Sequence, residues 1–283
     1  MKDRMITGLV SAGGVIQSFL ARMPALHGSL GPVKGFSLRV SRRIANGLKA
    51  GVGVGDYSAF CDCGSIWIAV PENMLDTVSA DLAREVPVRG KMIVLCDVLR
   101  DSLCPSPIRT SGARVATLNC MPESGGKIFV AEGNRDVLTM LRRLLAQDGY
   151  TLIELQPVSK PLYWSGIFLG SHVLFPWIAG AVESLRAAGF TRGQATRSVQ
   201  AMGGHALRSY ARAGSKAWNR AEASRLQEQI LKDFDAIRFT HPRVAALYLD
   251  NVEHRLPPGP VRKRTARRAG RIDTPASAQV ASF

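Results

Sequence analysis

The first half of the chain alternates between short apolar runs and stretches in which apolar residues recur at helical spacing. The apolar runs are strand candidates, at residues 5–10, 33–38, 65–70, 91–96, 114–118, 127–131 and 151–155, with a short strand inside the glycine-rich loop 47–55. Helical spacing is clearest at residues 73–84 and 135–147. Strands that alternate with helices predict an α/β domain, in which a parallel sheet is covered by helices on both faces.

The pattern changes after residue 156, and from there to about Arg255 it is helical throughout. The predicted helices are 160–188, 191–213 and 217–239, with a shorter one after Pro242. Ser159 is expected to cap the first of them, and Pro161 suits its first turn. The predicted fold class is an N-terminal α/β Rossmann-like parallel sheet, residues 1–156, followed by an all-α C-terminal domain, residues 157–256.

Residues 161–182 contain no Asp, Glu, Lys or Arg, and the stretch is long enough to span a bilayer. Two observations weigh against a membrane span: polar residues interrupt the stretch, and it follows a soluble α/β pattern with no second span. A helix that is buried within a helical domain or across a homodimer has the same composition. We therefore expect a dimer core and no membrane span.

The formal net charge of +15 favours anionic partners such as phosphorylated cofactors. Residues 257–283 hold six Lys or Arg and little that could be buried, so a basic disordered tail is predicted there. The folded part has no basic stripe rich in aromatic residues, so no specific nucleic acid is expected. Five cysteines, all in the first half, favour a reducing, cytoplasmic compartment, and their spacing predicts no metal site.

The turn after the first strand reads Ser11-Ala12-Gly13-Gly14-Val15. The dinucleotide fingerprint G-x-G-x-x-G, laid on this segment, falls on Ser11, Gly13 and Ile16, so only its middle glycine is present. A helix N-terminus attracts phosphate through its free N–H groups even without the other glycines. We interpret the five residues of the turn as a cofactor-binding site, and a plain strand–turn–helix remains the alternative.

The second predicted strand lacks the acidic residue with which an NAD site binds ribose hydroxyls, because no Asp or Glu lies between Asp3 and Asp56. Ser37, Arg39 and Arg42 stand there instead, and guanidinium and hydroxyl groups suit the 2′-phosphate of NADP. The alternative is a solvated basic helix start. Val70 and Pro71, at the end of a buried strand, are expected to border the cofactor or merely to end the strand.

Five stretches in this order resemble the 6-phosphogluconate dehydrogenase-like superfamily, which includes pyrroline-5-carboxylate reductase and ketopantoate reductase. They are "GLVSAGGVI", "SIWIAVPENML", "GARVATLNCM", "KIFVAEGN" and "SKPLYWSGIFLGSHVL". More narrowly, the chain resembles the Rossmann-like oxidoreductases of that superfamily whose domain has no assigned function. The resemblance implies an NAD(P)-binding domain, a helical domain that often dimerises, and a substrate bound between the two. This chain departs from the family at Asn119-Cys120, where relatives tend to have His-Pro, and at Asp97, where a small hydroxyl residue is common.

Within that frame the catalytic candidates are Lys160, Ser171, His172 and Asn119, with Asp97 beside them. Reduction of a C=O or C=N bond needs a hydride donor and a group that protonates the heteroatom. Lys160 and His172 are twelve residues apart and would lie close to one helical face. A solvated helix start for Lys160 and a hydrogen-bonded core histidine for His172 are the alternatives. The predicted function is an NADP-preferring oxidoreductase, or else a nucleotide-binding or scaffolding protein that has lost catalysis.

Overall fold

The computed structural model describes residues 5–13, 17–103, 106–122, 124–232 and 234–252. The chain divides into two compact units between Val173 and Leu174. The predicted cofactor residues Gly14 and Val15, and the predicted tail 257–283, lie outside the described residues.

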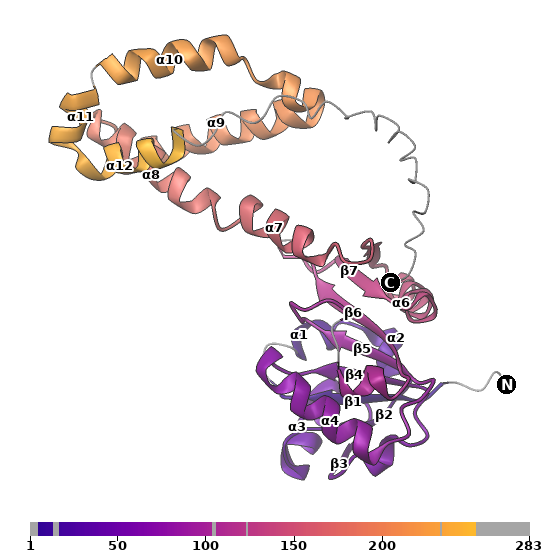
Figure 1. Cartoon of the computed structure of the whole chain (residues 1–283). Helices are drawn as coiled ribbons and strands as arrows, with labels where there is room; N and C mark the ends of the chain where they lie inside the picture. Colours follow the sequence, from indigo (N-terminus) through magenta and orange to yellow (C-terminus); the bar gives the residue numbers. More distant parts are fainter. Residues whose placement is uncertain (1–4, 14–16, 104–105, 123, 233, 253–283) are drawn as a thin grey trace, which may run out of the picture. The chain divides into compact units, whose positions relative to one another are not determined.

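The first unit is built on one sheet, which Figure 1 shows in indigo and magenta. The eight strands of the described residues are, in sheet order, β3 (Val52–Val54), β2 (Leu30–Lys34), β1 (Thr7–Ser11), β4 (Ser65–Ala69), β5 (Met92–Cys96), β6 (Arg114–Cys120), β7 (Ile128–Gly133) and β8 (Thr151–Glu154). The chain builds outward in opposite directions from the β1–β4 pair. In open α/β sheets this reversal places the ligand crevice at the carboxyl ends of the strands.

One pair of strands departs from the predicted parallel sheet, because β7 runs antiparallel to β6. The connection between them, residues 121–127, is too short for the crossover that a parallel pair needs. Gly125 and Gly126 take positive φ angles of 65° and 72° in this turn, a conformation that glycine adopts without steric cost. The other neighbouring strands pair in parallel, as predicted.

Helices cover both faces of the sheet, and each face has its own apolar core. On one face lie α1 (Gln17–Leu20), α2 (Pro24–His27), α3 (Leu38–Leu48) and α6 (Arg135–Gln147). On the other lie α4 (Leu75–Glu85), α5 (Pro107–Thr110) and the 3-10 helices η2 (Ser58–Phe60) and η3 (Glu72–Met74). Within β4, Trp67 packs into the first core while Ile66 and Ile68 pack into the second, as the two-residue period of a strand requires.

Glycine is required at Gly8 in β1 by close packing rather than by backbone conformation. A Cβ atom at this position would lie 2.4 Å from a ring carbon of Phe60 and 3.2 Å from the sulfur of Cys63. Phe60 is fully buried, so its ring has no open space into which it could move. The absence of a side chain at Gly8 therefore lets η2 pack directly against the central strand.

The second strand begins and ends earlier than predicted, at Leu30–Lys34 rather than 33–38. The chain leaves the sheet at Gly35, whose N–H donates to the hydroxyl of Ser41 at 2.8 Å. Ser37 then caps α3 by accepting from Val40 N at 3.3 Å. The helix predicted after β1 is also shorter, since α1 has only four residues in the described part of the chain.

The second unit is helical throughout its described residues (Figure 1). It contains α8 (Leu174–Ala187), α9 (Arg192–Ala213), the 3-10 helix η4 (Gly214–Ala217), α10 (Arg220–Lys232), α11 (Phe234–Thr240) and α12 (Pro242–Val252). The segment predicted as one helix at 217–239 is two helices, α10 and α11. An all-α second unit confirms the predicted fold class.

The helix predicted at 160–188 is interrupted, because α7 (Lys160–Gly170) ends before α8 begins. Pro176 accounts for the break: it has no N–H to donate, so it is tolerated only in the first turn of α8. The division between the two compact units lies beyond α7, because α7 bonds to the first unit through Lys160 and Trp164. The domain boundary at residue 156 stays a prediction.

The apolar stretch Lys160–Ala187 is long and apolar enough to cross a membrane, and little of it is buried within the chain. Within the single chain this stretch is thus not buried, and its burial across a homodimer stays a prediction. The side chains of Leu162 and Leu169 on α7 are 75% and 61% exposed, and Phe175 on α8 is 70% exposed. The single chain therefore leaves apolar surface exposed on both helices.

Candidate functional site

The turn after β1 lies at the carboxyl edge of the sheet, beside the end of β4. Ser11, the last residue of β1, pairs with Ala69 in register, and Ala12 N donates to Ala69 O at 3.1 Å. The hydroxyl of Ser11 is buried and accepts from Gly13 N at 3.1 Å. Gly13 has a φ of +80°, a conformation that favours glycine. Within the described part of the turn, the Ser11 hydroxyl therefore bonds the main chain at the position where the fingerprint has its first glycine.

The end of β4 completes this part of the edge. Val70 is buried, and Pro71 is exposed and stands at the N-cap of η3 with a φ of −55°. Both residues follow the strand beside β1, at the point where the strand order reverses. The structure thus brings together the residues that were predicted to bind the cofactor at the ends of β1 and β4, as far as these residues are described.

The start of α3 carries two predicted phosphate ligands, Arg39 and Arg42. Both side chains are exposed, and neither has an ion pair or a side-chain hydrogen bond within the described residues. They are three residues apart on one helix, so they point to the same side. The backbone of Gly53 in β3 approaches closely here, since a Cβ on it would lie 2.5 Å from Arg42 N.

The hydrogen-bond donors of these described residues fit the phosphates of a nicotinamide dinucleotide. The guanidinium groups of Arg39 and Arg42 are free to make charged hydrogen bonds with a phosphate, and cations at a helix N-terminus oppose the helix dipole unless an anion compensates. The left-handed turn at Gly13 leaves one side of the backbone open to close approach. The bond from Gly13 N to Ser11 occupies one donor that a pyrophosphate would otherwise use.

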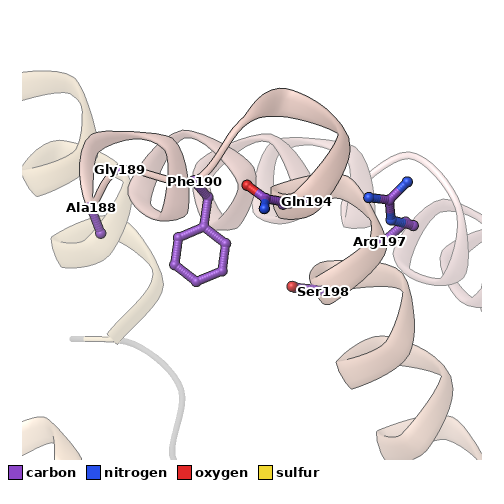
Figure 2. A pocket seen from close by; sticks show the side chains of 6 residues that line it. All are labelled: Ala188, Gly189, Phe190, Gln194, Arg197 and Ser198. Carbon is purple, nitrogen blue, oxygen red and sulfur yellow. The ribbon is translucent and has the colours of Figure 1, made fainter.

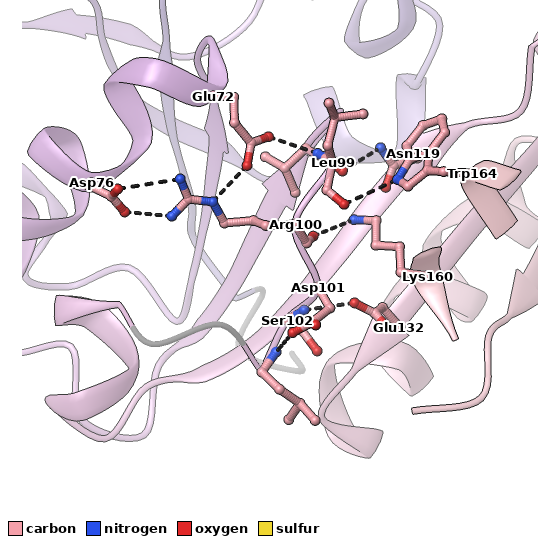
Figure 3. A network of polar contacts seen from close by, with 12 residues as sticks. Glu72, Asp76, Leu99, Arg100, Asp101, Ser102, Asn119, Glu132, Lys160 and Trp164 are labelled. Carbon is pink, nitrogen blue, oxygen red and sulfur yellow. Dashed lines mark hydrogen bonds and ion pairs between the residues drawn. The ribbon is translucent and has the colours of Figure 1, made fainter. Parts of the chain in front are cut away.

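A second polar cluster lies at the carboxyl ends of β5 and β6, around residues 98–102 (Figure 3). Side chains from several elements hold the main chain of this segment. Asn119 Nδ2 of β6 donates to Val98 O at 3.1 Å, Trp164 Nε1 of α7 donates to Leu99 O at 3.1 Å, Lys160 Nζ of α7 donates to Arg100 O at 2.8 Å, and Glu132 Oε1 of β7 accepts from Ser102 N at 2.7 Å. The segment is therefore fixed by elements far apart in the sequence.

Arg100 extends this cluster toward η3 and α4 (Figure 3). Its guanidinium donates to Glu72 at 2.7 Å and to Asp76 at 2.6 Å, and Glu72 also accepts from Leu99 N at 2.8 Å. The bonds to Asp76 and Glu72 raise the pKa of Arg100 above its usual range. Burial acts in the opposite direction but has the smaller effect. The ion pairs join the helix that follows Pro71 to the segment that follows β5.

Lys160 is almost fully buried, with 1% of its surface exposed, so the solvated helix start considered for it is wrong. Burial lowers the pKa of its ammonium group to about 8, although four carboxylates oppose the shift, with Glu132 the strongest. Glu132 is also buried, at 2% exposed. A buried ammonium bonded to a main-chain carbonyl is well placed to fix a loop, but it is not placed to touch a substrate.

Asp97 is an exposed acid at the carboxyl end of β5. It takes a φ of +53°, which is uncommon for a residue with a side chain. Its N–H donates to Leu118 O at 2.9 Å, and its carboxylate accepts a long bond from Cys120 N at 3.4 Å. Burial of part of the carboxyl group raises the pKa of Asp97, against the opposing effects of the Cys120 N–H and of Lys160. Strained residues of this kind cluster at functional sites.

The predicted catalytic residues do not form one group. Asn119 lies in the cluster, but Ser171 and His172 lie in the turn beyond the other end of α7, a helix of 11 residues or about 16 Å. Ser171 donates to Ile167 O at 2.5 Å, and the exposed ring of His172 lies 5.9 Å from that of Phe168. Since α7 ends at Gly170, the twelve-residue spacing does not place Lys160 and His172 on one helical face. The core-histidine alternative is also wrong, because His172 is exposed.

Sequence reasoning missed Glu72, Glu132 and Tyr163. Tyr163 comes three residues after Lys160, and its hydroxyl is enclosed without a hydrogen-bond partner among the described residues. The spacing of the two residues on one turn of helix was an available signal. No pattern in the sequence relates Glu132 to the segment after β5, because that contact depends on the pairing of β6 with β7.

A separate pocket of about 430 Å³ lies in the second unit, between the end of α8 and the start of α9 (Figure 2). It is lined by Ala188, Gly189, Phe190, Gln194, Arg197 and Ser198. None of the predicted site residues lines it. The described residues contain no group of three His, Cys, Asp or Glu side chains that could hold a metal ion.

These features together define a Rossmann-like α/β fold followed by an all-α unit. No family model and no curated protein matches the sequence. Among solved structures, the chain is similar to an imine reductase from Myxococcus stipitatus in complex with NAD+, with a TM-score of 0.57, 15% identity and 88% of each chain covered. It is also similar to pyrroline carboxylate reductases from Plasmodium falciparum with NADP bound (TM-score 0.51, 11% identity, 87% and 96% covered) and from Coxiella burnetii (TM-score 0.53, 10% identity, 87% and 96% covered).

Proposed function

We propose that the protein is an oxidoreductase that prefers NADP and acts on a C=O or C=N centre of a small molecule. The observation that carries the proposal is the pair Arg39 and Arg42, which are exposed at the start of α3 and have no partner among the described residues, beside an acid-free β2. Guanidinium groups there suit a 2′-phosphate and disfavour the ribose binding of an NAD site. The structural neighbours named as reductases with NADP or NAD+ bound support the reaction class.

The bound cofactor would supply a hydride, and the chain would supply binding and proton transfer. Ser37, Arg39 and Arg42 bind the phosphate on the ribose, and the left-handed Gly13 lets the main chain approach the pyrophosphate. Val70 and Pro71 border the site at the end of β4. Lys160 does not protonate the substrate, since its ammonium group is buried on Arg100 O, and its role is to hold the segment after β5.

The protein is proposed to act as a homodimer through its apolar helices. On α8 alone, Leu174, Phe175, Trp177 and Ile178 are between 39% and 70% exposed. A second copy that buried these side chains would contribute about 25 cal/mol for each Å² of apolar surface removed from water. We propose that it works in a reducing, cytoplasmic compartment, where the free thiols of Cys61 and Cys63 would persist.

The test of this proposal is an assay of NADPH oxidation in the presence of cyclic imines and 2-oxo acids. The oxidation is measured as the loss of the absorbance of reduced nicotinamide. Turnover with NADPH that falls sharply when NADH replaces it would support the proposal. Equal rates with the two cofactors would contradict the preference. The variant that tests the two phosphate ligands is Arg39→Ala combined with Arg42→Ala. Its matched control is Arg208→Ala combined with Arg212→Ala, because both of these arginines are exposed on α9 of the second unit.

A second candidate is a protein that binds the nucleotide without catalysis. It is favoured by the bond from Gly13 N to the Ser11 hydroxyl, because that bond occupies a donor in the cradle of the pyrophosphate. Saturable NADPH binding without turnover on any substrate in the panel would support this candidate over the first.

A further inference from the structure

The carboxylate of Glu72 holds the loop after β4 through both of its oxygen atoms. Glu72 directly follows Pro71 and begins η3. Its Oε1 accepts from Arg100 Nε at 2.7 Å, and its Oε2 accepts from Leu99 N at 2.8 Å (Figure 3). The two terminal nitrogens of the Arg100 guanidinium donate to Asp76, in the first turn of α4, at 2.6 Å and 3.4 Å. Arg100 thus joins η3 and α4 to the segment that follows β5.

The main chain of Arg100 is anchored to another element of the first unit. Its carbonyl accepts from the buried ammonium group of Lys160 at 2.8 Å, and the preceding carbonyl, of Leu99, accepts from Trp164 at 3.1 Å. The side chains of Arg100 and Glu72 are only 22% and 34% exposed, and a guanidinium that bonds two carboxylates there is held more firmly than in an exposed ion pair. The loop after β4 is therefore tied to a segment that α7 holds in place.

The order of the strands indicates which half of the proposed cofactor lies beside this loop. The 2′-phosphate of the adenosine half is assigned to Arg39 and Arg42, at the start of the helix that follows β2. Since β2 and β4 lie on opposite sides of β1, a dinucleotide that runs from α3 across the turn after β1 continues toward Pro71, at the end of β4. The position of Pro71 therefore affects the nicotinamide half of the cofactor and not its adenosine half.

We infer that Arg100 and Glu72 are positioning residues that fix Pro71 beside the nicotinamide half of the cofactor. This inference rests on the proposed function for the cofactor. Both residues act through the main chain and not on the reacting atoms, since the guanidinium of Arg100 is already bound by two carboxylates and both oxygens of Glu72 already accept bonds. Without the tether, the loop would lose conformational freedom when the cofactor binds, and that loss opposes binding.

Two ligands distinguish the two halves of the cofactor site. Adenosine 2′,5′-bisphosphate carries the 2′-phosphate but no nicotinamide, whereas NADPH carries both. In calorimetric titrations, Arg100→Gln should bind NADPH at least roughly tenfold more weakly than wild type and should bind the bisphosphate equally well, because only NADPH reaches the loop. Arg100→Lys should recover only part of the loss, since a single ammonium group does not reproduce the fork that bonds two carboxylates.

Arg114→Gln is the matched control for general damage to the fold. Arg114 begins β6, at the amino end of the sheet, and its Nη1 donates to Asp136 of α6 at 2.8 Å. Its guanidinium also bonds the carbonyl of Gly90, at 2.6 Å and 3.1 Å. Like Arg100, it joins separate elements through a carboxylate and a main-chain group, but at the opposite edge of the sheet. Its substitution should lower the melting temperature and leave the affinities for both ligands unchanged.

A double-variant cycle tests whether Arg100 and Glu72 act together. Glu72→Gln should also weaken NADPH binding, and the double variant should be little worse than either single variant, since both changes remove the same tether. Thermal unfolding shows whether each variant is folded, and Glu72→Gln, which keeps an acceptor for Leu99 N, carries the test if Arg100→Gln does not fold.

The outcomes separate this inference from the proposed function. Weakened NADPH binding with an unchanged affinity for the bisphosphate, in the Arg100 and Glu72 variants and not in Arg114→Gln, supports the inference. An unchanged NADPH affinity, an equal weakening of both ligands or additive effects in the double variant overturns it. A wild-type protein that binds neither ligand contradicts the proposed function itself, and this result is obtained before any variant is made.

Discussion

Lys160 Nζ donates to the main-chain carbonyl of Arg100 at 2.8 Å, and this bond joins the first turn of α7 to the segment that follows β5. The two residues are far apart in the sequence, and the ammonium group is almost completely buried. Because four carboxylates surround Lys160 at longer range, the charge is partly compensated, but burial still outweighs them. The bond explains why α7 belongs to the first unit.

The buried ammonium predicts a specific pH dependence of stability. The pKa of Lys160 falls from 10.5 to about 8 on folding, so the cost of keeping it charged is fully present below pH 8 and is relieved as pH rises from about 8 to 10.5. The free energy of unfolding of wild type, minus that of Lys160→Met, should therefore rise by up to about 3 kcal/mol across this window. Denaturant titrations at several pH values measure it, and a flat difference would show that Lys160 is solvated.

The close packing of Gly8 on Phe60 predicts a steric effect. Gly8→Ala should destabilise the protein by about 1–3 kcal/mol, since the added methyl group meets a buried ring at 2.4 Å. Gly47→Ala is the matched control: it lies in α3 with no atom within 4 Å of the added carbon, and it should stabilise by roughly 0.5–1 kcal/mol. Thermal unfolding of both variants checks the pair. Equal effects at the two positions would contradict the packing described for β1.

The exposed face of α8 predicts association. Light scattering of the detergent-free protein should give a dimer, and Phe175→Glu should raise its dissociation constant at least roughly tenfold, since a buried carboxylate would be unpaired. Val52→Glu is the control, because Val52 is similarly exposed, at 68%, on the edge strand β3 of the first unit. A chain recovered only with membranes would indicate instead that the stretch Lys160–Ala187 inserts into a bilayer.

Apolar runs identified most strands, but they misplaced the second one for a definable reason. Phe36 and Leu38 continued the apolar pattern of Val33, although they are 56% and 40% exposed at the start of α3. The pattern reports hydrophobicity and not burial, so it extended the strand into the helix. Ser37, which caps that helix, was the local signal for the true boundary.

The candidate site was predictable where it depends on local sequence. Ser11 ends β1, Gly13 comes shortly after it, and Val70 and Pro71 follow β4; strand ends meet at one edge of a parallel sheet. The cluster around residues 98–102 was not predictable, because Glu132 reaches it only through the antiparallel pairing of β7 with β6. The break in the helix at residues 171–173, which separates His172 from Lys160, had a local signal in Pro176, and the predicted helix 160–188 ran through it.

The free guanidinium groups of α3 predict the effect of a double substitution. Arg39→Ala combined with Arg42→Ala should weaken NADPH binding at least roughly tenfold and leave NADH binding unchanged, because charged hydrogen bonds are worth about 1.5–3 kcal/mol each. The α9 double variant, Arg208→Ala with Arg212→Ala, removes the same charge and should bind NADPH as wild type does. Fluorescence titration measures cofactor binding by wild type and the two double variants at one salt concentration, so that the salt screens charges equally in each.

The central claim, a dinucleotide site that prefers the phosphorylated cofactor, is tested most directly by titrating the wild-type protein with NADPH and with NADH. We expect saturable binding of both, with a dissociation constant for NADPH at least roughly tenfold lower, since at least one charged bond to the 2′-phosphate is available only to NADPH. Equal dissociation constants would contradict the assignment of Arg39 and Arg42. Absence of binding by either cofactor would contradict the site itself.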